Sequence, residues 1–259
     1  MIYTKRMSCL LFLVILVATT KCDCGIDPKP IHEAIESNDI DKVKLIIESG
    51  EDINVTDGRG RTPLYYAAWF GRKEIAEYLI SKGADMTKGA SWKGDNTPLH
   101  EAAEYGHINI VKLLLDKGVD PNIRNYPGQT PLMFAIDECY PEIVKLLIKY
   151  GANINAKEKN GRAPLGRWWL VGRSSKSIES YRETLKVLMN SGLDVNAKCD
   201  EDNGVIVTPL LVACNIGDIE MVKMLVLAGA DVNAENPLAY AKDKGLKEIA
   251  DFLIQHGAK

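Results

Sequence analysis

The stretch Thr97-Pro98-Leu99-His100-Glu101-Ala102-Ala103 decides the fold of this chain, because variants of it return along most of its 259 residues. A proline followed by leucine or isoleucine opens seven such segments, and the first five prolines, at positions 30, 63, 98, 131 and 164, are separated by 33, 35, 33 and 33 residues. In six of the seven units a glycine follows the proline by 20 residues. A period of about 33 residues predicts a solenoid, in which one supersecondary unit stacks on copies of itself.

Each unit is predicted to form two short helices. The threonine before the proline can cap the first helix, and proline is tolerated in the first turn because its missing N–H would have no acceptor there. In the third unit, Gly106 is expected to end the first helix, and residues 110–115 (IVKLLL) give the second helix a wide apolar stripe. Gly118 fits a left-handed C-terminal cap. The turn-rich stretch after it is expected to cross to the next unit.

With these features the chain resembles the ankyrin-repeat proteins. Thr97-Pro98-Leu99-His100, Gly106-His107 and Gly229-Ala230-Asp231-Val232-Asn233-Ala234 match that family's signature. The resemblance covers residues 28–259 and implies an all-α ankyrin-repeat solenoid of stacked helix-turn-helix pairs with short β-hairpin fingers. It also implies a non-enzymatic protein that binds another protein through the fingertips and the concave face of the first helices. We expect the repeats near residues 28–60, 61–94, 95–127, 128–160, 161–205, 206–234 and 235–259.

The first 22 residues have a different character. Lys5 and Arg6 precede an apolar run over residues 10–18, after which the chain turns polar, and this order is typical of secretory signal peptides. The run is shorter than the about 20 residues that span a membrane. We therefore expect residues 1–22 to be a signal peptide and the protein to be exported, whether secreted, periplasmic or associated with a cell envelope.

Two other interpretations of this leader stay open. Cys22 is a candidate for lipidation, as in bacterial lipoproteins, although Lys21 stands where that pattern has a small residue. A lipidated chain would be tethered to a membrane through its N-terminal segment, and its repeats would hold or protect a partner. Alternatively, the leader is retained or plays no part, and the repeats act inside a cell as an effector.

The net charge and the absence of catalytic motifs argue against nucleic-acid binding and against enzymatic activity. The formal charge of −3 comes from 32 basic and 35 acidic residues interspersed along the chain, which leaves no basic footprint for nucleic acid. The sequence contains no glycine-rich phosphate loop, no Gly-x-Ser-x-Gly elbow and no His-Glu-x-x-His motif. His32 and His100 occupy a motif position at which hydrogen bonds within and between repeats are expected. We therefore predict a monomer without enzymatic activity, cofactor or metal, whose partner is another protein.

Two cysteines occupy positions that other units give to small residues. Cys214 stands in the second alanine position of the sixth unit's first helix, and Cys139 stands where most inter-helix turns have glycine. We expect structural or free thiols here, because the cysteines fit no disulfide framework.

Departures from the repeat mark the candidate binding surface. In the ankyrin family, the residues after the paired alanines and the fingertips point toward a partner. Trp69 and Phe70 follow such alanines, and large aromatic and arginine side chains with little structural role commonly supply the affinity of interfaces. The alternative is that these rings pack on the neighbouring unit. The candidate partner-binding residues are Arg59, Arg61, Trp69, Phe70, Trp92, Lys93, Glu104, Tyr105, Tyr126, Gln129, Asp137, Glu138, Trp168 and Trp169.

The fifth unit departs most from the pattern. Trp168 and Trp169 fill its paired alanine positions, and 28 rather than 20 residues separate Pro164 from Gly192. Two indole rings do not fit where alanine methyl groups let helices touch, because protein cores have almost no spare volume. We expect either a local rearrangement, in which the inserted segment around residues 173–178 covers the rings, or an exposed patch of tryptophan and arginine that binds a partner.

Overall fold

The computed structural model describes residues 28–166, 177–200 and 206–259. These ranges hold six complete helix pairs and one further helix. In chain order they are α2 (Pro30–Glu36) with α3 (Ile40–Glu48), α4 (Pro63–Trp69) with α5 (Lys73–Ser81), α6 (Pro98–Glu104) with α7 (Ile108–Asp116), α8 (Pro131–Asp137) with α9 (Pro141–Lys149), α11 (Ile178–Asn190), α12 (Pro209–Ile216) with α13 (Ile219–Leu227), and α14 (Pro237–Asp243) with α15 (Lys247–Gln255). The shorter elements of the same ranges are the 3-10 helices η1 (Ser91–Lys93) and η2 (Pro164–Gly166) and the strands β1 (Cys199–Asp200) and β2 (Ile206–Val207).

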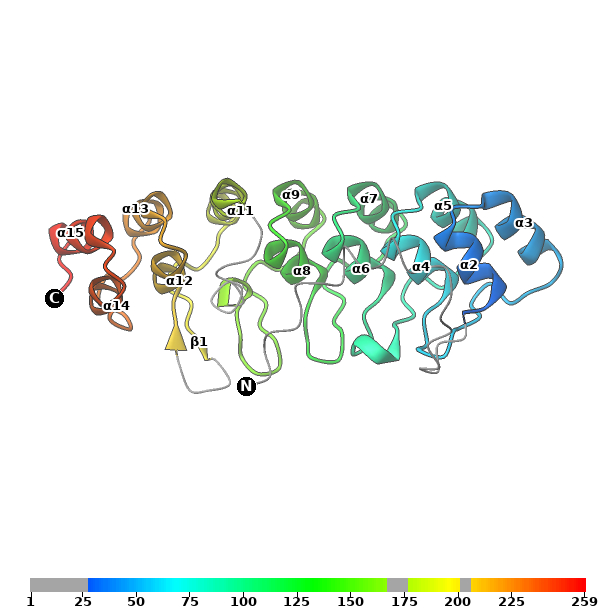
Figure 1. Cartoon of the computed structure of the whole chain (residues 1–259), viewed down its shortest axis with the longest axis horizontal. Helices are drawn as coiled ribbons and strands as arrows, with labels where there is room; N and C mark the ends of the chain where they lie inside the picture. The colour runs from blue at the N-terminus through cyan, green and yellow to red at the C-terminus, as the bar shows by residue number, and fades with distance from the viewer. Residues whose placement is uncertain (1–27, 167–176, 201–205) are drawn as a thin grey trace.

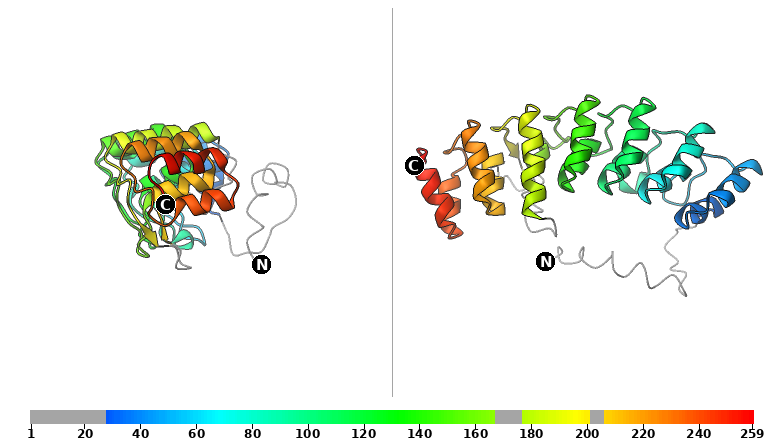
Figure 2. Two further views of the ribbon diagram at one scale, coloured as in Figure 1. Left: turned by 90° about the vertical axis from the view of Figure 1, so that its left-hand side faces the viewer. Right: turned by 90° about the horizontal axis from the view of Figure 1, so that it is seen from above.

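The helices form two layers (Figure 1). The first helix of each pair lies in one layer and the second in the other, and successive pairs lie side by side along the molecule (Figure 2). This arrangement confirms the predicted all-α solenoid. The loops between pairs extend below the first helices, and we call them fingers. The inner face is the surface made by the C-terminal ends of α2, α4, α6 and α8 together with the fingers at residues 57–61, 90–96, 125–129 and 158–162.

The threonine before proline caps α4 as the sequence predicts. Thr62 accepts a hydrogen bond from the N–H of Tyr65 at 3.1 Å, which satisfies one of the free donors of α4. In α6, the N–H of Thr97 donates to Nδ1 of His100 at 3.2 Å, and Nε2 of this ring lies 3.1 Å from the carbonyl oxygen of Gln129 in the next unit. Burial lowers the pKa of His100 to about 4, so the imidazole is neutral. The expected structural role of this histidine is confirmed.

Pairs of alanines let adjacent first helices touch. Ala67 and Ala68 of α4 and Ala102 and Ala103 of α6 are fully buried, and the two helices pack directly on one another. Cys214, at the corresponding position of α12, is buried too, and burial raises its pKa to about 12. A thiol in this state acts as a small apolar side chain rather than as a nucleophile.

The turn inside each pair requires a left-handed residue. Gly71 has φ +70°, and a Cβ there would lie 2.7 Å from the His107 ring of the next unit, so glycine leaves room for that ring. Nε2 of His107 lies 3.0 Å from the carbonyl oxygen of Trp69 and fixes the contact. Cys139 takes the same place between α8 and α9 with φ 53° and is buried. A side chain in this conformation costs about 1–2 kcal/mol.

Asparagine side chains connect the turns that follow the second helices. Asn122 accepts from the N–H of Asn153 at 2.7 Å and donates to the carbonyl of Gly151 at 2.9 Å, both in the next unit. The same two bonds to the following unit are made by Asn155, Asn196 and Asn233. We call this series the asparagine ladder.

One junction lacks the ladder contact. Asn54 accepts from the N–H of Asp85 at 2.8 Å and so joins the first unit to the second. In the second unit the ladder position holds Thr87, whose hydroxyl and N–H both donate to Asp85 of its own turn. Within the described ranges, no hydrogen bond from Thr87 reaches the third unit.

Most fingers are tight turns rather than regular hairpins. In the described part of the chain, β1 and β2 form one antiparallel ladder, with Cys199 opposite Val207, and Ala90 and Asn96 form an isolated bridge. Elsewhere a tight turn is closed by backbone and side-chain bonds together: the N–H of Asn125 donates to the carbonyl of Gln129 at 3.1 Å, and Asn125 Oδ1 accepts from the N–H of Gln129 at 2.8 Å. Short loops closed in this way leave few backbone groups for strand pairing.

The fifth unit opens with η2, and its second helix, α11, has 13 residues where the other second helices have nine. Trp168, Trp169, most of the inserted segment and the leader at residues 1–22 lie outside the described residues. Among the helices that are described, none has the length and apolar character needed to cross a membrane.

Candidate protein-binding surface

An aromatic cluster occupies the inner face where α4 meets α6. The rings of Trp69 and Phe70 stack with centroids 4.9 Å apart, and the Tyr105 ring of the next unit lies 6.2 Å from that of Trp69. Trp69 and Phe70 are half-buried, and Tyr105 is 37% exposed. We call these three residues the aromatic cluster. Because Phe70 and Tyr105 hold corresponding positions of adjacent units, the stacking of the helices brings them together.

A buried ion pair supports the aromatic cluster. Nη2 of Arg61 lies 2.6 Å from Asp57 Oδ2, and the guanidinium lies 4.6 and 5.2 Å from the ring centroids of Tyr66 and Trp69. Asp57 also accepts from the Tyr66 hydroxyl at 2.9 Å and from two backbone N–H groups. Burial raises the pKa of Asp57, but these hydrogen bonds, led by that from Arg61, lower it by more, so the carboxylate stays charged.

Arg61 differs from the expectation of a finger residue with little structural role. Its side chain is 4% exposed, because it reaches back to Asp57 and the aromatic rings instead of extending to solvent. Arg59, on the same finger, is half-buried and offers a partner more surface. Partner binding by this finger stays a prediction, and the Arg61 charge is already paired with Asp57.

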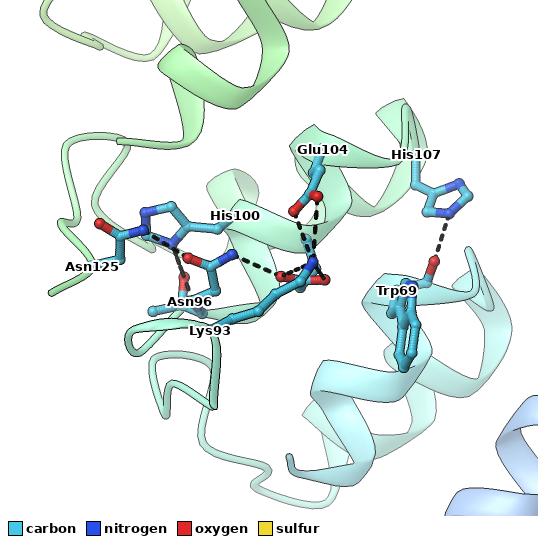
Figure 3. A network of polar contacts seen from close by, with 9 residues as sticks. Trp69, Lys93, Asn96, His100, Glu104, His107 and Asn125 are labelled. Carbon is cyan, nitrogen blue, oxygen red and sulfur yellow. Dashed lines mark hydrogen bonds and ion pairs between the residues drawn. The ribbon is translucent and has the colours of Figure 1, made fainter. Parts of the chain in front are cut away.

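Lys93 reaches the inner face from the next finger. Its ammonium lies 3.1 Å from Glu104 (Figure 3), 3.3 Å from Glu101 and 5.2 Å from the centre of the Tyr105 ring. Burial lowers the pKa of Lys93, but the charges of Glu101 and Glu104 raise it by more, so the lysine stays charged. Burial, and then the Glu101 charge, raise the pKa of Glu104. Two carboxylates thus share one ammonium at the edge of the aromatic cluster.

Amide side chains link three successive fingers. Asn96 Nδ2 donates to Glu101 at 2.9 Å, and Asn125 Nδ2 donates to Asn96 Oδ1 at 2.7 Å (Figure 3). Gln129 extends the chain, since its Oε1 lies 3.0 Å from Asn125 Nδ2 and its Nε2 donates to Glu158 at 3.3 Å. Gln129, a predicted partner contact, is therefore half-buried and bonded to its neighbours. The network holds the fingers at a fixed spacing.

The remaining candidates differ in how much surface they present. Tyr126 is 70% exposed at the tip of its finger. Asp137 and Glu138 stand at the end of α8 on the inner face, but Asp137 is 7% exposed and Glu138 is half-buried. The side chain of Trp92 and all of Trp168 and Trp169 lie outside what the structure describes.

The sequence analysis missed three residues of this surface. Asp57, Asn96 and Glu101 are buried polar groups whose partners come from other positions of the repeat. A signal existed for Glu101, because a carboxylate directly before the paired alanines of a packed helix must be buried and therefore needs a cation. Nothing in the repeat pattern pointed to Lys93 as that cation.

Two of the histidines among the described residues are buried in the array. Burial lowers the pKa of His32 to about 4, as it does that of His100, so both rings are neutral and enclosed. In the parts of the chain that the structure describes, no group of three or more His, Cys, Asp or Glu residues is placed to hold a metal ion. On the inner face, the aromatic cluster and Tyr126 keep part of their surface in solvent.

Comparisons with known proteins identify the repeats as ankyrin repeats. Family models described as ankyrin repeats match residues 31–80, 88–158 and 175–259. Myotrophin of Xenopus tropicalis is 48% identical over 52 residues, which are 20% of this chain and 44% of that protein. Protein phosphatase 1 regulatory subunit 27 of Homo sapiens is 47% identical over 55 residues, 21% of this chain and 36% of its own length. The E3 ubiquitin-protein ligase Ufd4 of Drosophila melanogaster is 42% identical over 62 residues, 24% of this chain and 2% of its own length. Each match thus spans less than half of the relative.

Proposed function

Because this chain belongs to the ankyrin-repeat family, we propose that it is a non-enzymatic scaffold that binds a partner protein through its inner face. The aromatic cluster is the observation that carries the proposal. Its three rings come from adjacent units, are fixed by packing, and keep part of their surface in solvent. Aromatic side chains in such a setting commonly form the energetic centre of an interface.

Recognition through this face uses a preformed surface. Arg61 and Asp57 hold the Trp69 ring, and Lys93 holds Glu104 beside Tyr105, before any partner arrives. Side chains that are already ordered lose little conformational entropy on binding, which leaves more of the contact energy for affinity.

The relatives support a protein as the partner without naming it. One is named as a regulatory subunit of protein phosphatase 1 and another as a ubiquitin-protein ligase, so similar repeats occur in proteins of unrelated roles. One fold commonly serves many functions, and the partner is set by the surface residues of each member.

The test places a photo-crosslinking amino acid at position 105 on the inner face and, as a control, at position 112 on α7. Each protein is exposed to an extract of the cells that make it. We expect one protein to be captured from position 105 alone, and its capture to be lost when Trp69→Ala and Phe70→Ala are combined. Lys112→Ala with Lys145→Ala, on exposed second-helix surface, should leave capture intact. Capture from position 112 that survives the aromatic change would overturn the proposal.

We also propose that the protein is exported, on the strength of its basic and apolar leader alone. N-terminal sequencing of the mature protein should find a start between Thr20 and Asp23. If the chain is instead a membrane-tethered envelope component, fatty-acid labelling should be present and should disappear in Cys22→Ala. Recovery of a chain that starts at Met1 from the soluble cytosol would contradict export and favour an intracellular effector.

A further inference from the structure

The fingers that follow α7 and α9 carry an exposed strip of positive charge. Arg124, Lys157 and Lys159 are exposed, and Tyr126 beside them is 70% exposed. We call these four residues the finger strip. The whole chain has a formal charge of −3, so the finger strip is a positively charged region on a chain whose net charge is negative.

No carboxylate of the described residues neutralises these three cations. Arg124 Nη1 donates to the carbonyls of Gly128 and Lys157 at 2.9 and 2.7 Å, and the Lys159 ammonium lies 4.3 Å from the centre of the Tyr126 ring. On the second helices, by contrast, exposed lysines pair with carboxylates, as Lys112, Lys145 and Lys223 do. The charges of the finger strip are therefore available to an external anion.

Glu158, between the two lysines of the finger strip, does not belong to it. Its side chain is buried and accepts from Gln129 Nε2 at 3.3 Å, on the interior side of the finger. Alternation along this finger thus sends the carboxylate inward, while Lys157 and Lys159 remain exposed.

Backbone contacts join the fingers into a rigid edge. The N–H of Tyr126 donates to the carbonyl of Gly94 at 2.6 Å, and the N–H of Lys159 donates to the carbonyl of Pro127 at 3.0 Å. A Cβ at Gly128 would lie 3.0 Å from the backbone nitrogen of Lys159, so glycine permits the two fingers to approach each other. The cations stand on a frame whose spacing is set before binding, which reduces the ordering cost.

We propose that the finger strip binds an acidic, extended segment of a partner protein. Aspartate or glutamate side chains of the segment would meet Arg124, Lys157 and Lys159, and the Tyr126 ring would pack against its backbone. A short acidic segment meets the finger strip alone, whereas a nucleic acid would also meet the acidic surface of the rest of the chain. The inference rests on the proposed function in taking the partner to be a protein, and it concerns Tyr126 and Lys159 of the inner face together with Arg124 and Lys157, not the aromatic cluster.

The probe is a fluorescein-labelled peptide of alternating glutamate and serine, and binding is followed by fluorescence anisotropy. We expect it to bind the wild type and to weaken as salt is raised. Lys157→Gln with Lys159→Gln should weaken binding by about tenfold, and Tyr126→Ser should weaken it by about threefold. The matched control, Lys82→Gln with Lys117→Gln, removes the same charge from the exposed ends of α5 and α7 and should change the affinity by less than about twofold.

Three results would overturn the inference: no binding up to about 1 mM peptide, an equal loss in the control pair, or tighter binding of single-stranded DNA of the same charge. Thermal unfolding followed by circular dichroism should be the same for all variants, because each changed side chain is exposed. If crosslinking from position 105 succeeds while the peptide fails to bind, this inference is wrong and the proposed function stands.

Discussion

Replacing Arg61 by methionine tests whether the ion pair next to the aromatic cluster stabilises the array. The Arg61 and Asp57 side chains are 4% and 0% exposed, so the variant leaves a buried carboxylate. Its remaining partners are the Tyr66 hydroxyl and two backbone N–H groups. Removing one partner of a buried pair costs about 3–5 kcal/mol, and the surviving hydrogen bonds place the expected loss near the lower end, at about 3 kcal/mol. Urea unfolding followed by circular dichroism measures this loss.

A double variant, Arg61→Met with Asp57→Asn, removes the buried charge together with its partner. We expect it to be at least about 1 kcal/mol more stable than Arg61→Met alone, because burying a neutral amide costs far less than burying a carboxylate. A loss below about 1 kcal/mol in Arg61→Met would show that the pair acts like an exposed one and would refute the reasoning. The reasoning would also be refuted if the losses of unfolding free energy in Arg61→Met and in Asp57→Asn summed to the loss in the double variant, because charges in contact must couple.

Acid should remove the stabilisation that Asp57 provides, because its folded pKa lies below the ordinary 3.8: the contribution is complete above that value and is lost as the pH falls through the folded pKa. In urea titrations below about pH 4, the wild type should therefore lose stability more steeply than the double variant, and parallel curves would contradict this. Asn122→Ala breaks two bonds to the next unit and should lower the free energy of unfolding by about 1–2 kcal/mol, while the exposed Asn109→Ala should change it by less than about 0.5 kcal/mol. Equal losses in these two variants would mean that the asparagine ladder adds nothing. Gly71→Ala should cost at least about 1 kcal/mol more than Gly83→Ala in thermal unfolding, because both positions have positive φ but only at Gly71 would the Cβ meet a ring, at 2.7 Å. Similar melting temperatures for the two variants would count against that steric contact.

The features that repeat could be predicted from the sequence, because each acts within one unit or on the next unit in a constant register. Thr62 caps its helix, His100 bonds to the following finger, and Cys139 adopts the left-handed turn that glycine adopts elsewhere. When the same residue type recurs at the same position of each unit, its structural role can be inferred from that repetition. The solenoid and its helix pairs follow from such positions alone.

The candidate surface was harder to predict, because the residue types that make its key contacts change from unit to unit. Lys93 lies in the finger that lengthens the spacing to 35 residues, and its carboxylate partners lie 8 and 11 residues later in the chain. Arg61 meets Asp57 only because the finger closes into a tight turn. Its place in a finger and its residue type made Arg61 a candidate binding residue, but only the closed finger shows that its charge is already paired with Asp57.

Among the residues that the structure describes, the threonine at position 87 leaves the joint between the second and third units without the hydrogen bonds of the asparagine ladder. A twist between units held by Asn122 must break two amide hydrogen bonds, whereas a twist between the second and third units breaks none from Thr87. Trp69 and Tyr105 stand on opposite sides of this joint. The spacing of these rings is therefore held by the His107 contact with the Trp69 carbonyl and by the packing of α4 on α6, and not by the ladder bonds that Asn122 makes farther along the array.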